Sequence, residues 1–134
     1  MKKLIYDLLN LMNKYEADYT NTFRNLTLGK KDDVIMFETS EFSKWYTKWK
    51  ERLARQDKKE NEVIKLMKSA NPSVIPRNHR VEEAIEAAVK NDDYSVMANL
   101  LKVLSEPFKY SEDQDEYTKL PKPTNIPYRT FCGT

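Results

Sequence analysis

The sequence contains few of the residues on which disulfides, metal sites and tight turns depend. Its 134 residues include one cysteine, one histidine and two glycines. The single cysteine, Cys132, excludes an internal disulfide and indicates a reducing, cytoplasmic environment. Because His79 is the only histidine, the chain also lacks the nitrogen and sulfur donors that a zinc site needs. Scarce glycine disfavours turn-rich all-β folds, which use glycine in their hairpins.

Long apolar runs and an excess of one charge are absent as well. The 23 basic and 21 acidic residues leave a formal net charge of +2, which gives no reason to expect a polyanionic partner. Met1–Ile5 resembles the start of a signal peptide, but Asp7 and Asn10 interrupt the apolar run and no cleavage site follows. No stretch approaches the roughly 20 apolar residues of a membrane span, so we expect no membrane association.

Motifs for catalysis are missing too. Gly29, Lys30 and Lys31 lack the spacing of a phosphate-binding loop. The acidic pairs 32–33, 82–83 and 92–93 fall at expected loops or helix starts, where capping and the helix dipole explain them. A nucleophilic pair of Cys132 with His79 has no other residue to support it. We therefore predict no catalytic, cofactor-binding or metal-binding residue, and no enzyme activity in this chain alone.

Helical periodicity is the strongest positive signal. Apolar residues recur at three- and four-residue spacing over most of residues 1–109, which predicts one-sided helices. The clearest stripe has offsets of 0, 3, 4, 7 and 11, at Phe42, Trp45, Tyr46, Trp49 and Leu53. Weaker stripes comprise Leu4, Ile5, Leu8, Leu11, Met12 and Tyr15; Tyr19, Phe23 and Leu26; Val63, Ile64, Met67 and Ala70; Val81, Ala84, Ile85, Ala88 and Val89; and Met97, Leu100, Leu101 and Leu104.

Capping residues set the expected boundaries of these helices. Polar side chains that accept hydrogen bonds from the first turn predict the starts. Gly29 predicts a stop because glycine adopts the left-handed conformation easily. The predicted starts are Asp18, Thr39 or Ser40, Asp57, Asn78, and Asp92 or Asp93.

The fold expected from these signals is mainly α. Residues 1–109 should form a compact bundle of about five to six helices. From residue 110 the periodicity ends, and Pro121, Pro123 and Pro127 favour extended backbone. Residues 110–134 are therefore predicted to be an extended, proline-bearing C-terminal tail.

A basic helix with two tryptophans raises the alternative of nucleic-acid binding. Lys44, Lys48 and Arg52 could contact phosphates while Trp45 or Trp49 stacked on bases. Both tryptophans, however, share the stripe of Phe42 and Leu53. The stripe is better explained as core, and nucleic-acid binding is the weakest of the hypotheses.

Three stretches of the sequence resemble the C-terminal part of the selenoprotein O family, also known as YdiU-like proteins. They are Ala17–Leu26, Asn71–Ile85 and Tyr128–Thr134. Further points of resemblance lie at Trp45, Trp49, Arg52 and Pro107–Phe108.

The resemblance implies a parent protein several times longer. Members of this family have a kinase-like catalytic region that uses ATP with magnesium or manganese to transfer AMP to protein hydroxyls. The catalytic residues of that region match nothing here, so no catalytic residue and no cofactor is assigned to this chain. It would be a piece cut from a longer protein or a truncated natural relative.

One family position does carry over. A selenocysteine or cysteine stands third from the end in many members, and Cys132 has that place here, followed by Gly133 and Thr134 instead of a pair of serines. The resemblance makes Cys132 a redox candidate whose partner would lie in the parent's kinase-like region.

The leading hypothesis is therefore a non-catalytic helical segment that supports the kinase-like core of an AMP transferase and carries a redox cysteine. The alternative is an independent helical module that binds a protein partner. The leading hypothesis predicts an exposed apolar patch, involving the stripe from Leu4 to Tyr15 or Tyr19 and Phe23, and possible self-association through it.

Overall fold

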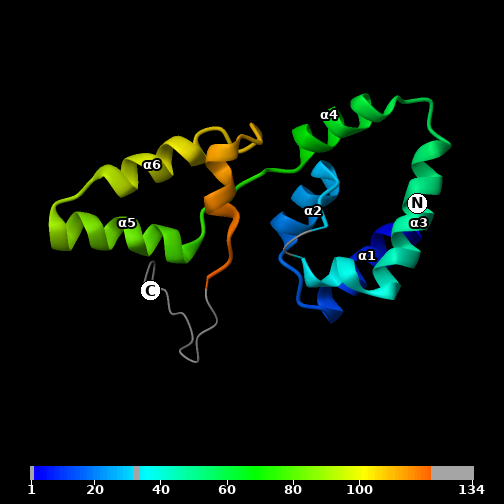
Figure 1. The fold of residues 1–134 in the computed structure, drawn as a ribbon, viewed down its shortest axis with the longest axis horizontal. Helices are drawn as coiled ribbons and strands as arrows, with labels where there is room; N and C mark the ends of the chain where they lie inside the picture. Colours follow the sequence, from blue (N-terminus) through cyan, green and yellow to red (C-terminus); the bar gives the residue numbers. More distant parts are fainter. Residues whose placement is uncertain (1, 32–33, 122–134) are drawn as a thin grey trace.

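The computed structural model describes residues 2–31 and 34–121. These residues are mainly α-helical and contain no β-strand, which confirms the predicted fold class (Figure 1). No helix among them is long and apolar enough to cross a membrane. The elements in chain order are α1 (Lys2–Lys14), α2 (Tyr19–Leu28), the 3₁₀ helix η1 (Ile35–Glu38), α3 (Ser40–Ala54), α4 (Glu60–Ala70), α5 (Asn78–Asn91), α6 (Ser95–Leu104) and the 3₁₀ helix η2 (Glu112–Thr118).

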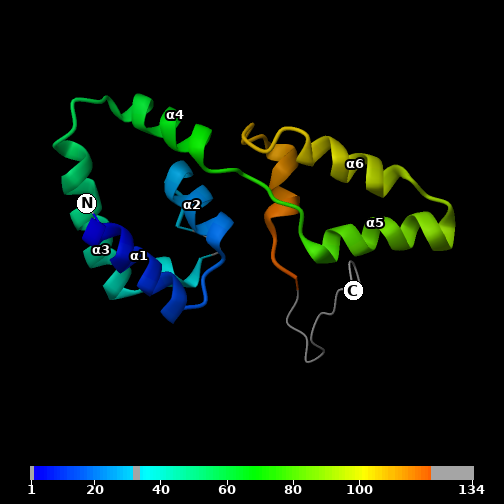
Figure 2. The same cartoon turned by 180° about the vertical axis from the view of Figure 1, so that it is seen from behind.

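The main hydrophobic core lies among the first three helices and η1. Phe42 and Met36 are almost fully buried at its centre, and the Phe37 ring stacks on Phe42 at 4.3 Å between centroids. The helix α1 packs mainly on α3, and α4 packs mainly on α2 (Figures 1 and 2). The buried members of this core are Leu8, Met12, Leu26, Val34, Met36, Phe37, Phe42 and Trp45.

Three predicted boundaries of these helices are confirmed. The Asp18 carboxylate accepts a hydrogen bond from the Asn21 amide at 2.9 Å and caps α2. Gly29 ends α2 with φ of 68°, and its amide donates to the carbonyls of Asn25 and Leu26. Thr39, rather than Ser40, caps α3 and accepts from the Phe42 amide at 3.2 Å. Local hydrogen bonding therefore fixes these ends as the sequence indicated.

Other predicted helix starts are wrong. The helix α4 begins at Glu60, three residues beyond Asp57, without a side-chain cap. Glu60 and Glu62 in its first turn interact favourably with the helix dipole, which explains how it starts without one. The residue before α5 is Arg77, in extended conformation, so Asn78 is the first helical residue instead of the cap.

The start of α6 also differs in detail. Asp92 ends α5 in a left-handed conformation with φ of 50°. Asp93 accepts hydrogen bonds from the amide and hydroxyl of Ser95, although the residue at the cap position is Tyr94. The hydrogen bonds from Ser95 account for the lowered pKa of the Asp93 carboxyl.

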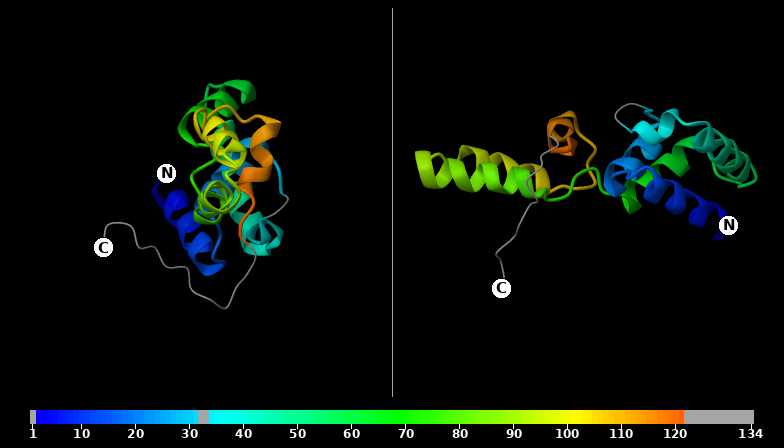
Figure 3. Two further views of the ribbon diagram at one scale, coloured as in Figure 1. Left: turned by 90° about the vertical axis from the view of Figure 1, so that its left-hand side faces the viewer. Right: turned by 90° about the horizontal axis from the view of Figure 1, so that it is seen from below.

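The helices α5 and α6 form an antiparallel pair that projects away from the main core (Figure 3). Ala84, Leu100 and Val103 are buried, and η2 packs on α6. The predicted apolar stripes of these two helices are only partly covered, because Ile85, Val89 and Leu101 are 50%, 76% and 61% exposed. A pair of helices can cover only the facing side of each member, so an apolar stripe wider than that side stays outside.

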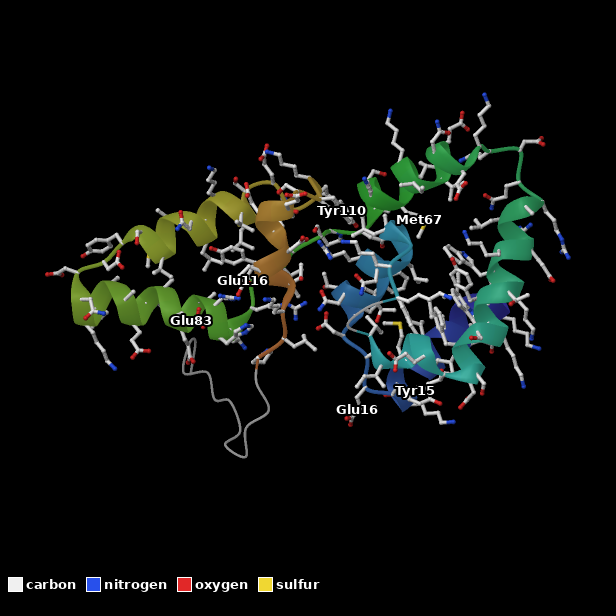
Figure 4. All side chains as sticks on the ribbon, viewed as in Figure 1. Tyr15, Glu16, Met67, Glu83, Tyr110 and Glu116 are labelled. Carbon is white, nitrogen blue, oxygen red and sulfur yellow. The ribbon has the colours of Figure 1, made fainter. Side chains whose placement is uncertain are left out.

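A neck of seven residues, 71–77, joins the α1–α4 group to the α5–α6 pair. Ser73 and Val74 in it are buried, and the Ser73 amide donates to the Pro107 carbonyl at 2.7 Å. The Tyr110 hydroxyl donates to the Asn71 carbonyl. Figure 4 shows Tyr110 beside this neck. The neck is therefore held by the segment that follows α6.

The tail expected from residue 110 begins with structure of its own. Glu112–Thr118 forms η2, and the buried Gln114 side chain donates to the Glu106 carbonyl at 2.6 Å. Such a short helix has no amphipathic period of its own, which is why the sequence pattern did not reveal it. Residues 122–134 lie outside the described part of the chain.

Candidate functional site: a polar junction and an apolar groove

A junction of charged side chains connects α2, the neck and η2. The Arg77 guanidinium, at the end of the neck, donates to both carboxylate oxygens of Asp18 at 2.9 and 2.8 Å. Asn21, one turn into α2, donates from its side-chain amide to the Thr118 carbonyl at 2.8 Å. The start of α2 is thereby bonded to the start of α5 and to the end of η2.

The Asp18–Arg77 pair is shielded from solvent. The side chains are 20% and 9% exposed. Burial acts to raise the pKa of the Asp18 carboxyl, but the hydrogen bonds from Arg77 and the Asn21 amide, with the Arg77 charge, outweigh it and hold the pKa below its ordinary value. Asp18 is therefore ionised in the folded chain at neutral pH, and the ion pair is intact there.

Two further arginines anchor η2. Arg24 is buried in α2 and donates to the Ser73 hydroxyl at 2.9 Å and to the Asp115 carboxylate at 2.5 Å. Arg80 donates to the carbonyl and carboxylate of Glu116 at 2.7 and 3.0 Å, and its guanidinium lies 5.2 Å from the centroid of the Tyr117 ring. Hydrogen bonds, first from Lys119 and then from Arg80, lower the pKa of Glu116.

The charges of this junction are balanced among its own residues. Each arginine faces at least one carboxylate, so the cluster offers no excess charge to a ligand. Among the described residues, no group of three histidine, cysteine or acidic side chains is arranged to hold a metal ion. The hydrogen bonds and ion pairs of the junction hold α2, the neck and η2 together.

An apolar groove of about 350 Å³ is lined by residues of all four helices of the α1–α4 group. Its floor includes the buried Leu8, Leu26 and Trp45, and the rings of Trp45 and Trp49 stack with centroids 5.7 Å apart. Met67 points from α4 into the space between α2 and α3 (Figure 4). The remaining lining residues are Leu4, Ile5, Leu9, Phe23, Arg52, Leu53, Gln56, Lys58, Val63, Leu66 and Asn71.

The groove exists because α4 is only half covered. No residue of α4 is fully buried, although its Val63 and Met67 are partly so. Ile5 and Leu9 of α1 and Leu66 of α4 are 52%, 39% and 50% exposed along the same opening. Of the N-terminal stripe that was predicted to contribute an exposed patch, Ile5 is exposed, whereas Leu8 and Met12 are buried. Of the two aromatic residues named with it, Tyr19 is 64% exposed and Phe23 is partly buried.

The residues singled out from the sequence do not gather at one place. Cys132, the redox candidate, lies outside the described residues. His79 is in the first turn of α5 and is partly buried. Trp45 is 6% exposed and its ring N–H donates to the Leu4 carbonyl at 2.8 Å, so it is a core residue and unavailable for stacking on bases. Trp49 packs beside it and is partly buried.

Sequence periodicity did not reveal the three arginines of the junction. Arg24, Arg77 and Arg80 lie in two of the family-like stretches, Ala17–Leu26 and Asn71–Ile85, which the fold brings together. A signal was nonetheless present, because Arg24 is the only charged residue of α2. A charged residue at such a place needs a partner.

Comparison with known proteins places this sequence in a family. A family model described as protein adenylyltransferase SelO matches residues 1–105. A protein nucleotidyltransferase YdiU from Clostridium botulinum (strain 657 / Type Ba4) is 60% identical over 131 residues, which is 98% of this chain and 27% of that protein. The protein of the same name from Bacillus cereus (strain ATCC 14579) is also 60% identical, with the same coverage. The chain thus spans about a quarter of the length of these relatives, and it belongs to the protein adenylyltransferase SelO family.

Proposed function

We propose that this chain is the non-catalytic, helical C-terminal region of a SelO-family protein adenylyltransferase and that it supports the kinase-like catalytic region. One observation carries the proposal. The chain is 60% identical over nearly its whole length to relatives named protein nucleotidyltransferases, yet it spans only 27% of their length. The missing three quarters have room for the catalytic region that the resemblance implies.

The surface of the chain is consistent with this role. Ile5, Leu9 and Leu66 are exposed apolar residues of the groove lining, and Val89 and Leu101 are exposed apolar residues on α5 and α6. A contiguous apolar surface such as the groove lining marks docking sites in proteins. ATP and magnesium or manganese belong to the parent in this proposal, with no site for them in this chain.

A reconstitution experiment tests the proposal. The Bacillus cereus relative is expressed without the region that matches this chain, and AMP transfer from labelled ATP to a protein substrate is followed with and without this chain added. We expect this chain alone to transfer no AMP and the shortened relative to gain thermal stability and activity when it is added. AMP transfer by this chain alone, or a shortened relative whose stability and activity ignore it, contradicts the proposal.

The same experiment separates the alternative function. If the chain is instead an independent module that binds a protein partner of its own, adding it should change neither the stability nor the activity of the shortened relative. Two variants show which apolar surface is needed for an effect on the shortened relative. Leu53→Asp alters the groove, and Leu101→Asp alters the exposed surface of α6. Leu101→Asp makes the same change on the other surface, because Leu101 is exposed on α6 and does not line the groove.

We also propose that Cys132 is an accessible, redox-competent thiol whose partner is a cysteine of the kinase-like region. Within this chain it has no second cysteine, so oxidation yields a mixed disulfide, a disulfide-linked dimer or a sulfenic acid. Thiol titration of the native and the denatured chain tests its accessibility. A thiol that reacts only after denaturation contradicts the redox role.

A further inference from the structure

We propose that the groove between α1, α3 and α4 binds an acidic amphipathic helix, supplied by the catalytic part of the same parent protein. The inference rests on the proposed function for the source of the helix. Its chemical content, an apolar face flanked by carboxylates, comes from the groove itself.

The shape of the groove favours a helix as occupant. Residues of four helices line the groove, and Ile5, Leu9 and Leu66 among them are exposed, so its apolar lining is open to solvent. A small ligand needs only an enclosed pocket, whereas an amphipathic helix places side chains at i, i+3/i+4 and i+7 along an open apolar strip. The open apolar lining therefore fits a helix better than a small molecule.

Charge decides the chemistry of that helix. The only charged residues that line the groove are Arg52 and Lys58, and both are basic. Neither forms an ion pair with a described residue. The adjoining hollow between α1 and α3 adds Lys3, Lys48 and Arg55 against Asp7 and Glu51. Carboxylates beside the apolar face of a bound helix would therefore meet unpaired cations.

The same charges disfavour self-association through the groove. A second copy would bring its own Arg52 and Lys58 to the interface, and like charges brought together in an interface oppose binding. The groove is also concave, which suits a convex helix rather than a flat lipid surface. An acidic helix from another segment is the occupant that satisfies both shape and charge.

The chain offers its own reporter for a binding test. Trp45 and Trp49 are its only tryptophans, and both line the groove. The probe is a synthetic 18-residue helical peptide with leucines on one face and glutamates on the other. A matched peptide carries lysine in place of glutamate. We expect the glutamate peptide to shift tryptophan emission saturably and to bind at least about tenfold more tightly than the lysine peptide.

Substitutions in the rim test the charge argument. Arg52→Glu and Lys58→Glu should each weaken the glutamate peptide about tenfold, while Lys90→Glu on the exposed face of α5 should not. Lys58 is exposed, so its variant remains informative if Arg52→Glu impairs folding. Equal binding of the two peptides, no binding of either, or rim variants that bind like the unaltered chain would overturn the proposal.

A second measurement separates this inference from the proposed function. The shortened Bacillus cereus relative is titrated with the unaltered chain and with Leu53→Asp and Leu101→Asp variants. Weakened binding by Leu53→Asp alone supports the groove as the docking site. If the Leu53→Asp variant binds the shortened relative as tightly as the unaltered chain does, the groove is not the docking site, while the proposed function stands. No binding of the unaltered chain overturns the proposed function and, with it, the source assigned to the helix.

Discussion

At the scale of single residues, Asp18 connects two parts of the fold with one carboxylate. It caps α2 through the Asn21 amide and pairs with both terminal nitrogens of Arg77. The pKa of its carboxyl is lowered from the ordinary value of 3.8, because the hydrogen bonds and the Arg77 charge outweigh its burial. A lowered pKa in the folded state means that the stability from this pair is complete above pH 3.8 and is lost as pH falls through the folded value.

We expect Asp18→Asn to lower the free energy of unfolding by about 2 kcal/mol at pH 7, since asparagine still caps a helix but carries no charge for Arg77. Urea denaturation of both chains measures the difference, which should shrink as pH is lowered below 3.8. Glu86→Gln, in an exposed pair with Lys90, should change stability little and serves as control. Equal stabilities at pH 7, or a difference that stays constant at low pH, contradict this account.

The two tryptophans should differ sharply when truncated. Trp45→Ala removes a buried ring with a hydrogen bond to Leu4 and should cost about 3–5 kcal/mol. Trp49 lies at the edge of the groove and is partly buried, so Trp49→Ala should cost clearly less. Thermal and urea unfolding of the two variants compare them. A loss for Trp49→Ala as large as that for Trp45→Ala would show that Trp49 belongs to the core itself.

At the scale of elements, the end of α2 depends on one glycine. Gly29 has φ of 68°, and a Cβ atom at that position would meet no other atom within 4 Å. Any cost of substitution is therefore a backbone cost. Gly29→Ala should destabilise the chain by about 1 kcal/mol, and Gly29→Asn by less, because asparagine tolerates the left-handed conformation. Chemical denaturation measures both, and a neutral Gly29→Ala would show that the helix end can relax.

Helix ends were predictable where one side chain or one glycine decides them. Asp18, Gly29 and Thr39 act through hydrogen bonds within three or four residues, and the sequence pattern contains that information. The start of α5 was not predictable, because Arg77 there is held by Asp18, 59 residues away in the chain. The same reason applies to the candidate site, whose arginines find their partners only through the tertiary fold.

The burial of an apolar helix face followed the sequence pattern only where other elements pack against that face. The stripe of Phe42 and Trp45 is buried because α1 and η1 pack over α3. The equally regular stripe of Ile85 and Val89 is exposed, since α5 has only α6 as its main neighbour. Periodicity shows which side of a helix is apolar, but a partner surface decides whether that side is buried.

At the scale of the whole molecule, buried apolar residues are distributed unevenly. The main core lies within residues 8–45, whereas α5 buries only Ala84 and α6 only Leu100 and Val103. Regions with few buried contacts open at lower free energy than the core. Hydrogen exchange measured by mass spectrometry should therefore show slower exchange in α1 and α3 than in α5 and α6. Uniform protection along the chain would mean that the two groups unfold as one unit.

The neck gives the molecule a mechanical property. Ser73 is bonded to both Arg24 and Pro107, and Asn71 to Tyr110, so the chain is braced where the two groups meet. The 14 residues of α5 form an arm of roughly 21 Å at 1.5 Å per residue. On such a lever, a rotation of about 5° at the brace moves the tip near Asp92 by only about 2 Å. A force on the far end of α5 would therefore act on α2, because Arg77 and Ser73 connect the base of α5 to Asp18 and Arg24 of α2.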